Sequence, residues 1–416
     1  MSRKHLMRDV FSAAYERTLW VYKNENFRPI VAFSGGKDSG IVLELAIMAA
    51  RETGRLPIDV SFCDEEALFP GTEEYLLRTA SRDEVRFHWH LLTYPQVNIF
   101  NRQEPFWWLF DDRLSPDKWV RKFPKWAKWV PEVEIANVVN YYNFPVEKGQ
   151  KLATLLGIRC AESRGRMMGM YSSKSFHTGG KGVKNVWPIY DWKANDVWKA
   201  VKEFGWDYNH VYDDWTRMKV KANEQKVAPP TMVVASLKML RPAAILWPRW
   251  FDKLCERCPG VREGVKYGSA FLNPHKREDE TWEQAYHRLI LGPTAPEWIR
   301  ERGQKFKEIV LKRHYKHSAS PLPQIYGCPA CQPNFSSWFK MTVAMYLGDP
   351  FCYKQRVLPL VEPEYFRPGF GTWKDGISFD RMPKWVKDLD TYDETIANMN
   401  IRLADGNKKK RRKEAI

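Results

Sequence analysis

The chain has 416 residues, of which 44% are hydrophobic, and 66 Lys and Arg against 50 Asp and Glu give a formal charge of +16. This length suffices for one large or two ordinary domains, each with its own core. No run of about 18 apolar residues occurs, so no membrane span is expected. The first residues also lack the long apolar run of a secretory signal. We therefore expect a cytoplasmic protein whose seven cysteines stay reduced.

The positive charge favours a polyanionic partner. The run from Lys408 to Lys413 holds six of the positive charges, and removing it takes the formal charge from +16 to +10. Cations bind phosphates and aromatic faces stack on exposed bases, so this charge together with 19 Trp favours a nucleic-acid partner. The alternative is that a phosphate-handling enzyme is itself basic and that the tryptophans fill its core.

Helices and strands alternate from an early point in the chain. Apolar residues at helical spacing predict a leading helix over 7–24, and the apolar run 30–33 predicts a buried parallel strand. The segment from about 95 to 147 interrupts the alternation with five tryptophans among scattered Pro and Lys, and we interpret it as an insertion. The remaining predicted elements are helices over 38–52, 72–79 and 194–204 and strands over 58–62, 85–92, 154–158 and 186–189. This alternation predicts an α/β fold with a parallel sheet covered on both faces.

A domain boundary is expected in the polar segment from Val220 to Pro230, which ends in a Pro pair. Beyond it lies a mostly helical region with five of the seven cysteines. The predicted parts are an N-terminal helix over 1–27, a nucleotide-binding domain over 28–225 with the Trp-rich insertion, a helical four-cysteine domain over 226–400 and a basic tail over 401–416. The charge run predicts that the tail is disordered.

The string Ser34-Gly35-Gly36-Lys37-Asp38-Ser39 stands between a predicted strand and a predicted helix. Paired glycines allow a tight turn in which consecutive backbone N–H groups converge on an anion. The helix adds the positive end of its dipole, the serine hydroxyls can donate to phosphate oxygens, and the lysine adds a mobile positive charge. An ordinary strand-to-helix turn is the alternative. We predict that these six residues bind the phosphates of a nucleotide.

The loop lacks the GxxxxGK[ST] spacing of a Walker A loop. It resembles the signature of the PP-loop ATP pyrophosphatases, which engage nucleotides at the linkage between the α and β phosphates. This resemblance implies an adenine nucleotide alpha hydrolase-like fold with ATP or an adenylyl sulfate as ligand. If the ligand is ATP, Mg²⁺ accompanies it, and Asp38 is the nearest acidic candidate to bind that ion.

The segment from Phe62 to Thr72 is similar to the D-T-G-x-x-F-P-x-T block of phosphoadenylyl-sulfate reductases and of the small subunit of sulfate adenylyltransferase. Glu65 and Glu66 replace the usual Thr and Gly of that block. Asp64 stands just beyond a predicted strand, where an acidic side chain can reach a ribose hydroxyl. We therefore expect Asp64 to contact the nucleotide.

The segment Gly157-Ile158-Arg159-Cys160-Ala161-Glu162-Ser163-Arg164-Gly165-Arg166 resembles the G-x-R-x-x-E-S-x-x-R block of the same family. Arginines suit this place because their planar fork grips phosphate or sulfate through two hydrogen bonds. The resemblance implies that Arg159 and Arg166 bind the anion, with Arg164 as a further candidate and Glu162 orienting one of them. The alternative is a solvated basic helix face.

Two further blocks, Trp187–Trp198 and Asp207–Asp213, look like the P-x-x-D-W-x-x-x-D-V-W and P-Y-N-x-L-Y-D segments of the family. We expect most of their residues to be structural, with Trp192 and Trp198 packing a helix on the sheet. The four blocks cover about residues 28 to 215 in the family's order. This part of the chain is identified as a member of the phosphoadenylyl-sulfate reductase family.

The chain departs from that family in its cysteines. It has neither the E-C-G-x-H nucleophile of the reductases nor the adjacent cysteine pair of the iron–sulfur reductases. It has two CxxC pairs instead, Cys255 with Cys258 and Cys328 with Cys331, and each such turn puts two sulfurs on one side of a metal. We expect Zn²⁺ bound by these four thiolates. A [4Fe–4S] cluster, which tRNA-thiolating and DNA-phosphorothioating relatives carry, and unmetallated core cysteines remain alternatives.

The three other cysteines lack such spacing and are expected to be buried apolar residues. They are Cys63, Cys160 and Cys352. Cys160 is also a candidate nucleophile, because the neighbouring Arg159 would lower the pKa of its thiol. The layout of the four-cysteine region further resembles proteins described as IbrA-like, predicted phosphoadenosine phosphosulfate sulfurtransferases associated with a ParB-like partner.

These features favour an enzyme that transfers an adenylyl or sulfur-containing group from the nucleotide to an acceptor, for which nucleic acid is one candidate. Catalysis would be electrostatic, with Lys37, Arg159 and Arg166 stabilising charge on the phosphates. One alternative is a nucleotide sensor that acts through a ParB-like partner without turnover. Another is a nucleic-acid-binding module with a vestigial loop, although the intact glycines and Lys37 argue against decay.

Overall fold

The computed structural model describes residues 7–93, 95–111, 113–131, 144–173, 175–179, 182–222, 224–230, 232–233, 236–331 and 337–350, together with 358 and 361. These residues form two compact units. The first unit contains the described residues of 7–93 and 109–230, and the second contains those of 95–108 and from 232 on. Cys352 and the basic tail over 401–416 lie outside the described residues.

The first unit is built on a seven-stranded sheet with the order β6-β3-β2-β1-β7-β9-β8. Neighbouring strands are parallel except β8 and β9, which are antiparallel. The strands are β1 (Phe27–Ala32), β2 (Ile58–Asp64), β3 (Val85–Thr93), β6 (Lys128–Pro131), β7 (Lys151–Leu156), β8 (His177–Gly179) and β9 (Val183–Val186). The predicted α/β fold with a mostly parallel sheet is confirmed.

The core of this unit lies around β1. This strand pairs with β2 at Val31↔Val60 and with β7 along its whole length. Val31, Val60 and Leu155 are all fully buried. Strands covered on both faces need apolar residues on both faces, which is why the later part of β1 belongs to the uninterrupted apolar run 30–33 rather than to an alternating pattern.

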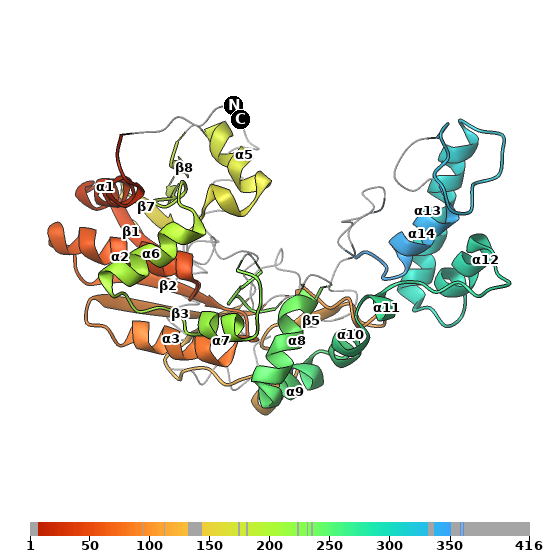
Figure 1. Ribbon diagram of the computed structural model, residues 1–416, viewed down its shortest axis with the longest axis horizontal. Helices are drawn as coiled ribbons and strands as arrows, with labels where there is room; N and C mark the ends of the chain where they lie inside the picture. Colours follow the sequence, from red (N-terminus) through yellow and green to blue (C-terminus); the bar gives the residue numbers. More distant parts are fainter. Residues whose placement is uncertain are drawn as a thin grey trace. The chain divides into compact units, whose positions relative to one another are not determined.

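Helices pack against this sheet. α1 (Val10–Lys23) begins at Asp9, whose carboxylate accepts a hydrogen bond from the Ser12 backbone N–H at 2.9 Å. α2 (Lys37–Glu52) packs against α1 and α6 (Ala194–Phe204), so these three helices lie side by side (Figure 1). The other helices of the unit are α3 (Pro70–Ala80), α5 (Arg164–Ser173) and α7 (Val211–Arg217), with the short turns η1 (Pro116–Lys118) and η2 (Cys160–Glu162).

The Trp-rich segment from 95 to 147 is divided between the two units. Its first part forms β4 (Pro95–Val97) and β5 (Phe106–Trp108), an antiparallel pair in the second unit. Its later part returns to the first unit, where the Val120 backbone N–H donates to the Glu66 carboxylate at 3.0 Å and β6 joins the sheet. Residues 132–143 lie outside the described residues.

The second unit is mostly helical, as the sequence predicted (Figure 1). Tyr286, Ile299, Phe306 and Met341 are fully buried in a hydrophobic cluster that joins its later helices. The helices are α8 (Leu237–Leu246), α9 (Pro248–Arg257), α10 (Val261–Tyr267), α11 (Ser269–Leu272), α12 (Trp282–Tyr286), the π-helical turn η4 (His287–Leu291), α13 (Glu297–Tyr315) and α14 (Trp338–Met345). In the described part of the chain, no helix is both long and apolar enough to cross a membrane.

Candidate nucleotide site and metal-ligand cluster

The strand order reverses at the carboxyl ends of β1 and β7. From β1 the chain passes through α2 to β2 on one side, whereas β7 is added on the other side of β1. Ligands of open parallel sheets bind outside the carboxyl ends of the strands at such a switch point. The loop Ser34–Ser39 follows β1 and the segment Gly157–Arg166 follows β7. Both segments predicted to bind an anion therefore lie at this edge.

The loop after β1 is a tight turn that leads directly into a helix. Gly35 has a φ of +69°, in the left-handed region that favours glycine. The hydroxyls of Ser34 and Ser39 lie 3.0 Å apart, and the Ser34 backbone N–H donates to the Ser39 hydroxyl at 3.2 Å. Gly36 stands at the N-cap of α2 and offers the first turn no side chain. The positive end of the helix dipole is thus directed at the place expected for phosphate.

Two contacts hold this loop from either side. The buried Asn209 donates through Nδ2 to the Gly35 carbonyl at 2.9 Å and to Thr72 Oγ1 at 3.0 Å. On the β7 side, Gly157 lies against the first turn of α2, where a Cβ atom would stand 2.7 Å from the Asp38 carbonyl carbon. The position therefore excludes any larger residue unless the backbone moves.

Beside the loop, one carboxylate lies between two cations. Asp38 Oδ1 accepts a hydrogen bond from Arg159 Nε at 2.6 Å, and its Oδ2 lies 3.3 Å from Arg159 Nη2 and 3.2 Å from Lys37 Nζ. The Lys37 ammonium also lies 5.2 Å from the centre of the Tyr212 ring, within cation–π distance. Arg159 is buried. An anion that reaches the loop must compete with the Asp38 carboxylate for both cations.

The predicted arginines differ in exposure. Glu162 Oε2 accepts a hydrogen bond from the Arg159 backbone N–H at 3.3 Å and forms an ion pair with Arg166, and Glu162 Oε1 lies 3.9 Å from Arg159 Nη2. Arg164 and Arg166 are exposed on the first turn of α5, whereas Arg159 is buried beside the loop. Glu162 therefore links the buried arginine to one of the exposed pair.

Asp64 is fully buried at the end of β2. Its Oδ2 accepts a hydrogen bond from Trp89 Nε1 at 2.8 Å and forms an ion pair with Arg121, and its Oδ1 accepts one from the Glu66 backbone N–H at 3.0 Å. Both carboxylate oxygens are thus engaged. The ribose contact of Asp64 stays a prediction, and it requires one of these partners to move.

The two lone cysteines near this edge differ in their surroundings. Burial raises the pKa of the Cys63 thiol to about 12, which keeps it protonated near neutral pH and makes it a poor nucleophile. Cys160 is half-buried in η2, next to Arg159, and its backbone N–H donates to the Tyr190 carbonyl at 2.8 Å. The catalytic role of Cys160 stays a prediction.

Comparison with known proteins identifies the segment that holds this site. Residues 28–217 match the family model described as the phosphoadenosine phosphosulfate reductase domain. This segment, called the reductase domain below after the family model that it matches, contains the loop after β1 and the arginine segment after β7 in the order that the sequence motifs predicted.

Two curated proteins resemble the chain. YbdN of Escherichia coli (strain K12) is 25% identical over 387 residues, which are 86% of this chain and 93% of that protein. MJ0973 of Methanocaldococcus jannaschii is 26% identical over 191 residues, which are 46% of this chain and 40% of that protein. The likeness to YbdN therefore extends well beyond the reductase domain.

Three solved structures show a more distant likeness. The Candida auris phosphoadenylyl-sulfate reductase is 17% identical with a TM-score of 0.27, covering 51% of this chain and 94% of its own. The tRNA thiolase NcsA of Methanococcus maripaludis is 13% identical with a TM-score of 0.29, covering 71% and 88%. The Candida glabrata FMN adenylyltransferase is 14% identical with a TM-score of 0.31, and the match spans 50% of this chain and 62% of that enzyme, less than two thirds of its length. At these TM-scores the likenesses support no argument about function.

Three residues of the reductase domain support the site although no role in it was predicted for them. Asn209 and Tyr212 belong to the block over Asp207–Asp213, which the sequence analysis interpreted as mainly structural, and the match of that block to the family was the available signal. Arg121 comes from the Trp-rich segment, where nothing in the sequence links it to Asp64.

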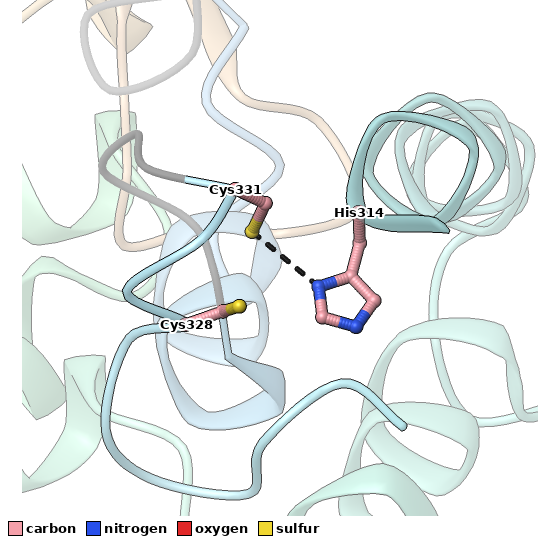
Figure 2. A group of neighbouring side chains, drawn as sticks. All are labelled: His314, Cys328 and Cys331. Atoms are coloured by element: carbon pink, nitrogen blue, oxygen red, sulfur yellow. Dashed lines mark hydrogen bonds between the residues drawn. The ribbon is translucent and has the colours of Figure 1, made fainter. Parts of the chain in front are cut away.

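The second unit brings together part of the predicted metal site. Nδ1 or Nε2 of His314 and the sulfurs of Cys328 and Cys331 all lie within 4.8 Å of one another (Figure 2). Cys255, on α9, and Cys258, at the end of that helix, do not belong to this group. The four-cysteine zinc site stays a prediction, and His314 is a neighbour that the CxxC spacing did not suggest.

The thiols of these pairs are perturbed in different directions. Burial raises the pKa of Cys255 to about 11. Backbone hydrogen bonds from Cys331 and Ala330 lower the pKa of Cys328, because they stabilise the thiolate. The turn therefore favours the ionised form of the Cys328 sulfur, whereas burial and the neighbouring Cys328 raise the pKa of Cys331.

Proposed function

We propose that the loop Ser34–Ser39 binds the phosphates of ATP or of an adenylyl sulfate, and that the chain transfers an adenylyl or sulfur-containing group from this nucleotide to an acceptor. The observation that carries the proposal is the convergence of the loop, the N-terminus of α2 and the buried Arg159 at the switch point of the sheet. The match of residues 28–217 to the reductase family supports the choice of nucleotide.

Two routes of group transfer suit this arrangement. In the first, the acceptor attacks the α-phosphorus, and pyrophosphate or sulfate leaves with the electrons of the broken P–O bond. In the second, the acceptor attacks the sulfur of an adenylyl sulfate, and the adenylate leaves with the electrons of the broken S–O bond. Both place extra negative charge on oxygens near the loop, and we propose that Lys37, Arg159 and Arg166 stabilise that charge.

The surroundings of Asp38 bear on the choice between the two nucleotides. ATP needs Mg²⁺, for which Asp38 is the proposed ligand. Both oxygens of this carboxylate face Arg159 or Lys37 in the structure, so binding Mg²⁺ would require these ion pairs to rearrange. An adenylyl sulfate needs no Mg²⁺, but its anion must also draw Arg159 and Lys37 away from Asp38, so these ion pairs alone do not distinguish the two nucleotides.

The proposed acceptor is a nucleic acid, and the proposed location is the cytoplasm. A formal charge of +16 supports a polyanionic acceptor, and the run from Lys408 to Lys413 would add affinity without base specificity. Cys63, Cys328 and Cys331 are free thiols, which suits a reducing compartment.

A second candidate function is nucleotide sensing through a ParB-like partner without turnover. It is favoured by the position of Asp38, because a bound anion would take Arg159 and Lys37 from this carboxylate and so change the contacts between α2 and the segment after β7. Under this hypothesis the protein retains its nucleotide and consumes none of it, even with the partner and nucleic acid present.

The substitution Lys37→Ala tests the proposal. Removing a charge-assisted contact costs about 1.5–3 kcal/mol, so nucleotide binding should weaken roughly 10- to 100-fold. Binding of ATP and adenylyl sulfate would be measured by calorimetry, and turnover by ATP–pyrophosphate exchange and by consumption of adenylyl sulfate. Lys23→Ala on α1, where the side chain is 60% exposed, is the control and should change neither quantity. Unchanged binding and turnover in a folded Lys37→Ala variant would contradict the proposal.

A further inference from the structure

In the second unit, three buried side chains place atoms that can bind a metal close to one another (Figure 2). His314 lies in the last turn of α13, and Cys328 and Cys331 stand at the two ends of a short turn that precedes α14. Their exposed fractions are 1%, 7% and 6%. We propose that His314, Cys328 and Cys331 together bind one Zn²⁺ ion, independently of the nucleotide chemistry proposed above.

The hydrogen bonds of His314 prepare it to bind a metal. Its Nε2 lies 2.7 Å from the Ser320 carbonyl oxygen, and a carbonyl can only accept, so Nε2 carries the proton. In the neutral imidazole, Nδ1 is then the nitrogen without a proton, and it lies 3.4 Å from the Cys331 sulfur. A histidine that binds a metal through one nitrogen characteristically donates the other N–H to a carbonyl or carboxylate, which fixes both its tautomer and its ring orientation.

The spacing of the three groups suits a tetrahedral ion. Zinc bonds of about 2.3 Å to sulfur and about 2.0 Å to nitrogen place neighbouring ligand atoms roughly 3.5–4 Å apart. The three ligand atoms already lie within 4.8 Å of one another, and one pair lies 3.4 Å apart, so binding requires a closure of at most about 1 Å. Rotations about the side-chain bonds of the two cysteines can supply such a movement.

The types of donor atom favour zinc over other ions. Thiolate and imidazole ligands suit Zn²⁺, whereas Mg²⁺ and Ca²⁺ take oxygen ligands. A [4Fe–4S] cluster is held by four cysteine thiolates, and this group of described residues supplies two. The ion would join the end of α13 to the turn at Cys328, beside the hydrophobic cluster of this unit.

The metal content of the purified full chain tests the site. Wild-type protein, reconstituted under reducing conditions, should hold about one zinc per chain. His314→Ala and Cys328→Ser should lose it. His317→Ala, a matched change at an exposed histidine three residues further on, should retain it, as should the double substitution of Cys255 and Cys258 by Ser.

A spectroscopic measurement identifies the ligands directly. X-ray absorption at the zinc edge should show two sulfur ligands and at least one nitrogen. If His314→Ala does not fold, His314→Cys keeps a ligand at this position and should retain the metal with a third sulfur. Wild-type protein that binds no zinc would overturn the proposal. Four sulfur ligands that disappear when Cys255 and Cys258 are replaced would overturn it in favour of the four-cysteine site.

Discussion

At the scale of single residues, Asn209 holds the loop Ser34–Ser39 in place. It is fully buried, its Nδ2 donates to the Gly35 carbonyl and to Thr72 Oγ1, and its Oδ1 accepts the Val211 backbone N–H at 3.1 Å. One side chain therefore ties the loop to α3 and to the start of α7. Removing it leaves a buried carbonyl and a buried N–H without their partner.

Asn209→Ala should lower both stability and nucleotide affinity. A buried polar group that loses its partner costs about 1–3 kcal/mol, and the Gly35 carbonyl is one of the groups affected. Thermal unfolding and calorimetric titration with ATP and adenylyl sulfate would measure the two effects. Asn195→Ala, at an exposed position of α6, is the matched control. Wild-type affinity in the Asn209→Ala variant would show that the loop does not depend on this support.

The roles of residues that stand close together in the chain could be predicted from the sequence. Contacts between residues far apart in the chain could not. The glycines, the serines and Lys37 of the loop stand together in the chain, so a shared role in binding an anion could be predicted from them. The ion pair of Arg121 with Asp64 joins residues 57 apart in sequence. His314 lies 17 residues before Cys331, and only the fold brings its ring to the sulfur.

At the scale of elements, the close approach of β7 to α2 sets the shape of the site. Gly157 follows β7 directly, and a Cβ atom there would stand 2.7 Å from both the carbonyl carbon of Asp38 and the backbone nitrogen of Ser39. No side-chain rotation relieves such an overlap, because both atoms belong to the backbone. The segment with Arg159 can therefore stay beside the loop only if this position is glycine.

Gly157→Ala should separate the arginine segment from the loop. Overpacking of this kind typically costs about 1–3 kcal/mol, and we expect nucleotide binding to weaken by roughly ten-fold or more, measured by calorimetry. Gly169→Ala on α5 is the control, since a Cβ atom there meets nothing within 4 Å. It should leave binding unchanged and, as a helical glycine replaced by alanine, raise stability slightly. Equal affinity in both variants would contradict the proposed role of this contact.

The elements themselves were largely predictable, because apolar periodicity is a local property. The strand at β2 and the helices α2 and α6 form within a few residues of the expected bounds. The Trp-rich segment was not predictable in the same way. β4 and β5 pair with each other in the second unit, while β6 pairs with β3 in the first, and these partners depend on tertiary packing rather than on the segment's own sequence.

At the scale of the whole molecule, acid stability should depend on a buried histidine. His90 on β3 is fully buried, and neither ring nitrogen has a hydrogen-bond partner among the described residues. Burial, together with the charges of His88 and Lys128, lowers its pKa from 6.5 to about 3. Between these two pH values the unfolded chain binds a proton that the folded chain does not. The contribution of neutral His90 to the free energy of unfolding is therefore fully present above pH 6.5 and decreases as the pH falls below that value.

The predicted slope is about 1.4 kcal/mol of unfolding free energy per pH unit. Urea unfolding of wild type and of His90→Leu, followed by tryptophan fluorescence at pH 7 and pH 5, would measure it. The variant should lose less stability than wild type between the two pH values. His210→Gln, an exposed histidine of the same unit, should behave as wild type. An equal loss in His90→Leu would assign the pH dependence to other groups.

The fold could be predicted from the sequence, and the candidate nucleotide site could be proposed from it, because both depend on short motifs that stand at the ends of strands. The reaction could not be predicted in the same way. It depends on which acceptor binds and on whether a bound nucleotide releases the cations held by Asp38, and both depend on the geometry of the complex with the nucleotide. The same is true of the second unit. Its CxxC pairs predict metal binding from the sequence, but only the fold shows that His314 lies beside Cys328 and Cys331.

Amide hydrogen exchange of the full chain, with and without adenylyl sulfate, tests the central claim most directly. Exchange slows where a ligand covers or stabilises backbone N–H groups. If the nucleotide binds as proposed, protection should appear at residues 34–40 and at 157–163, the two segments at the carboxyl ends of β1 and β7. Binding that protects other segments and leaves these two unchanged would contradict the account.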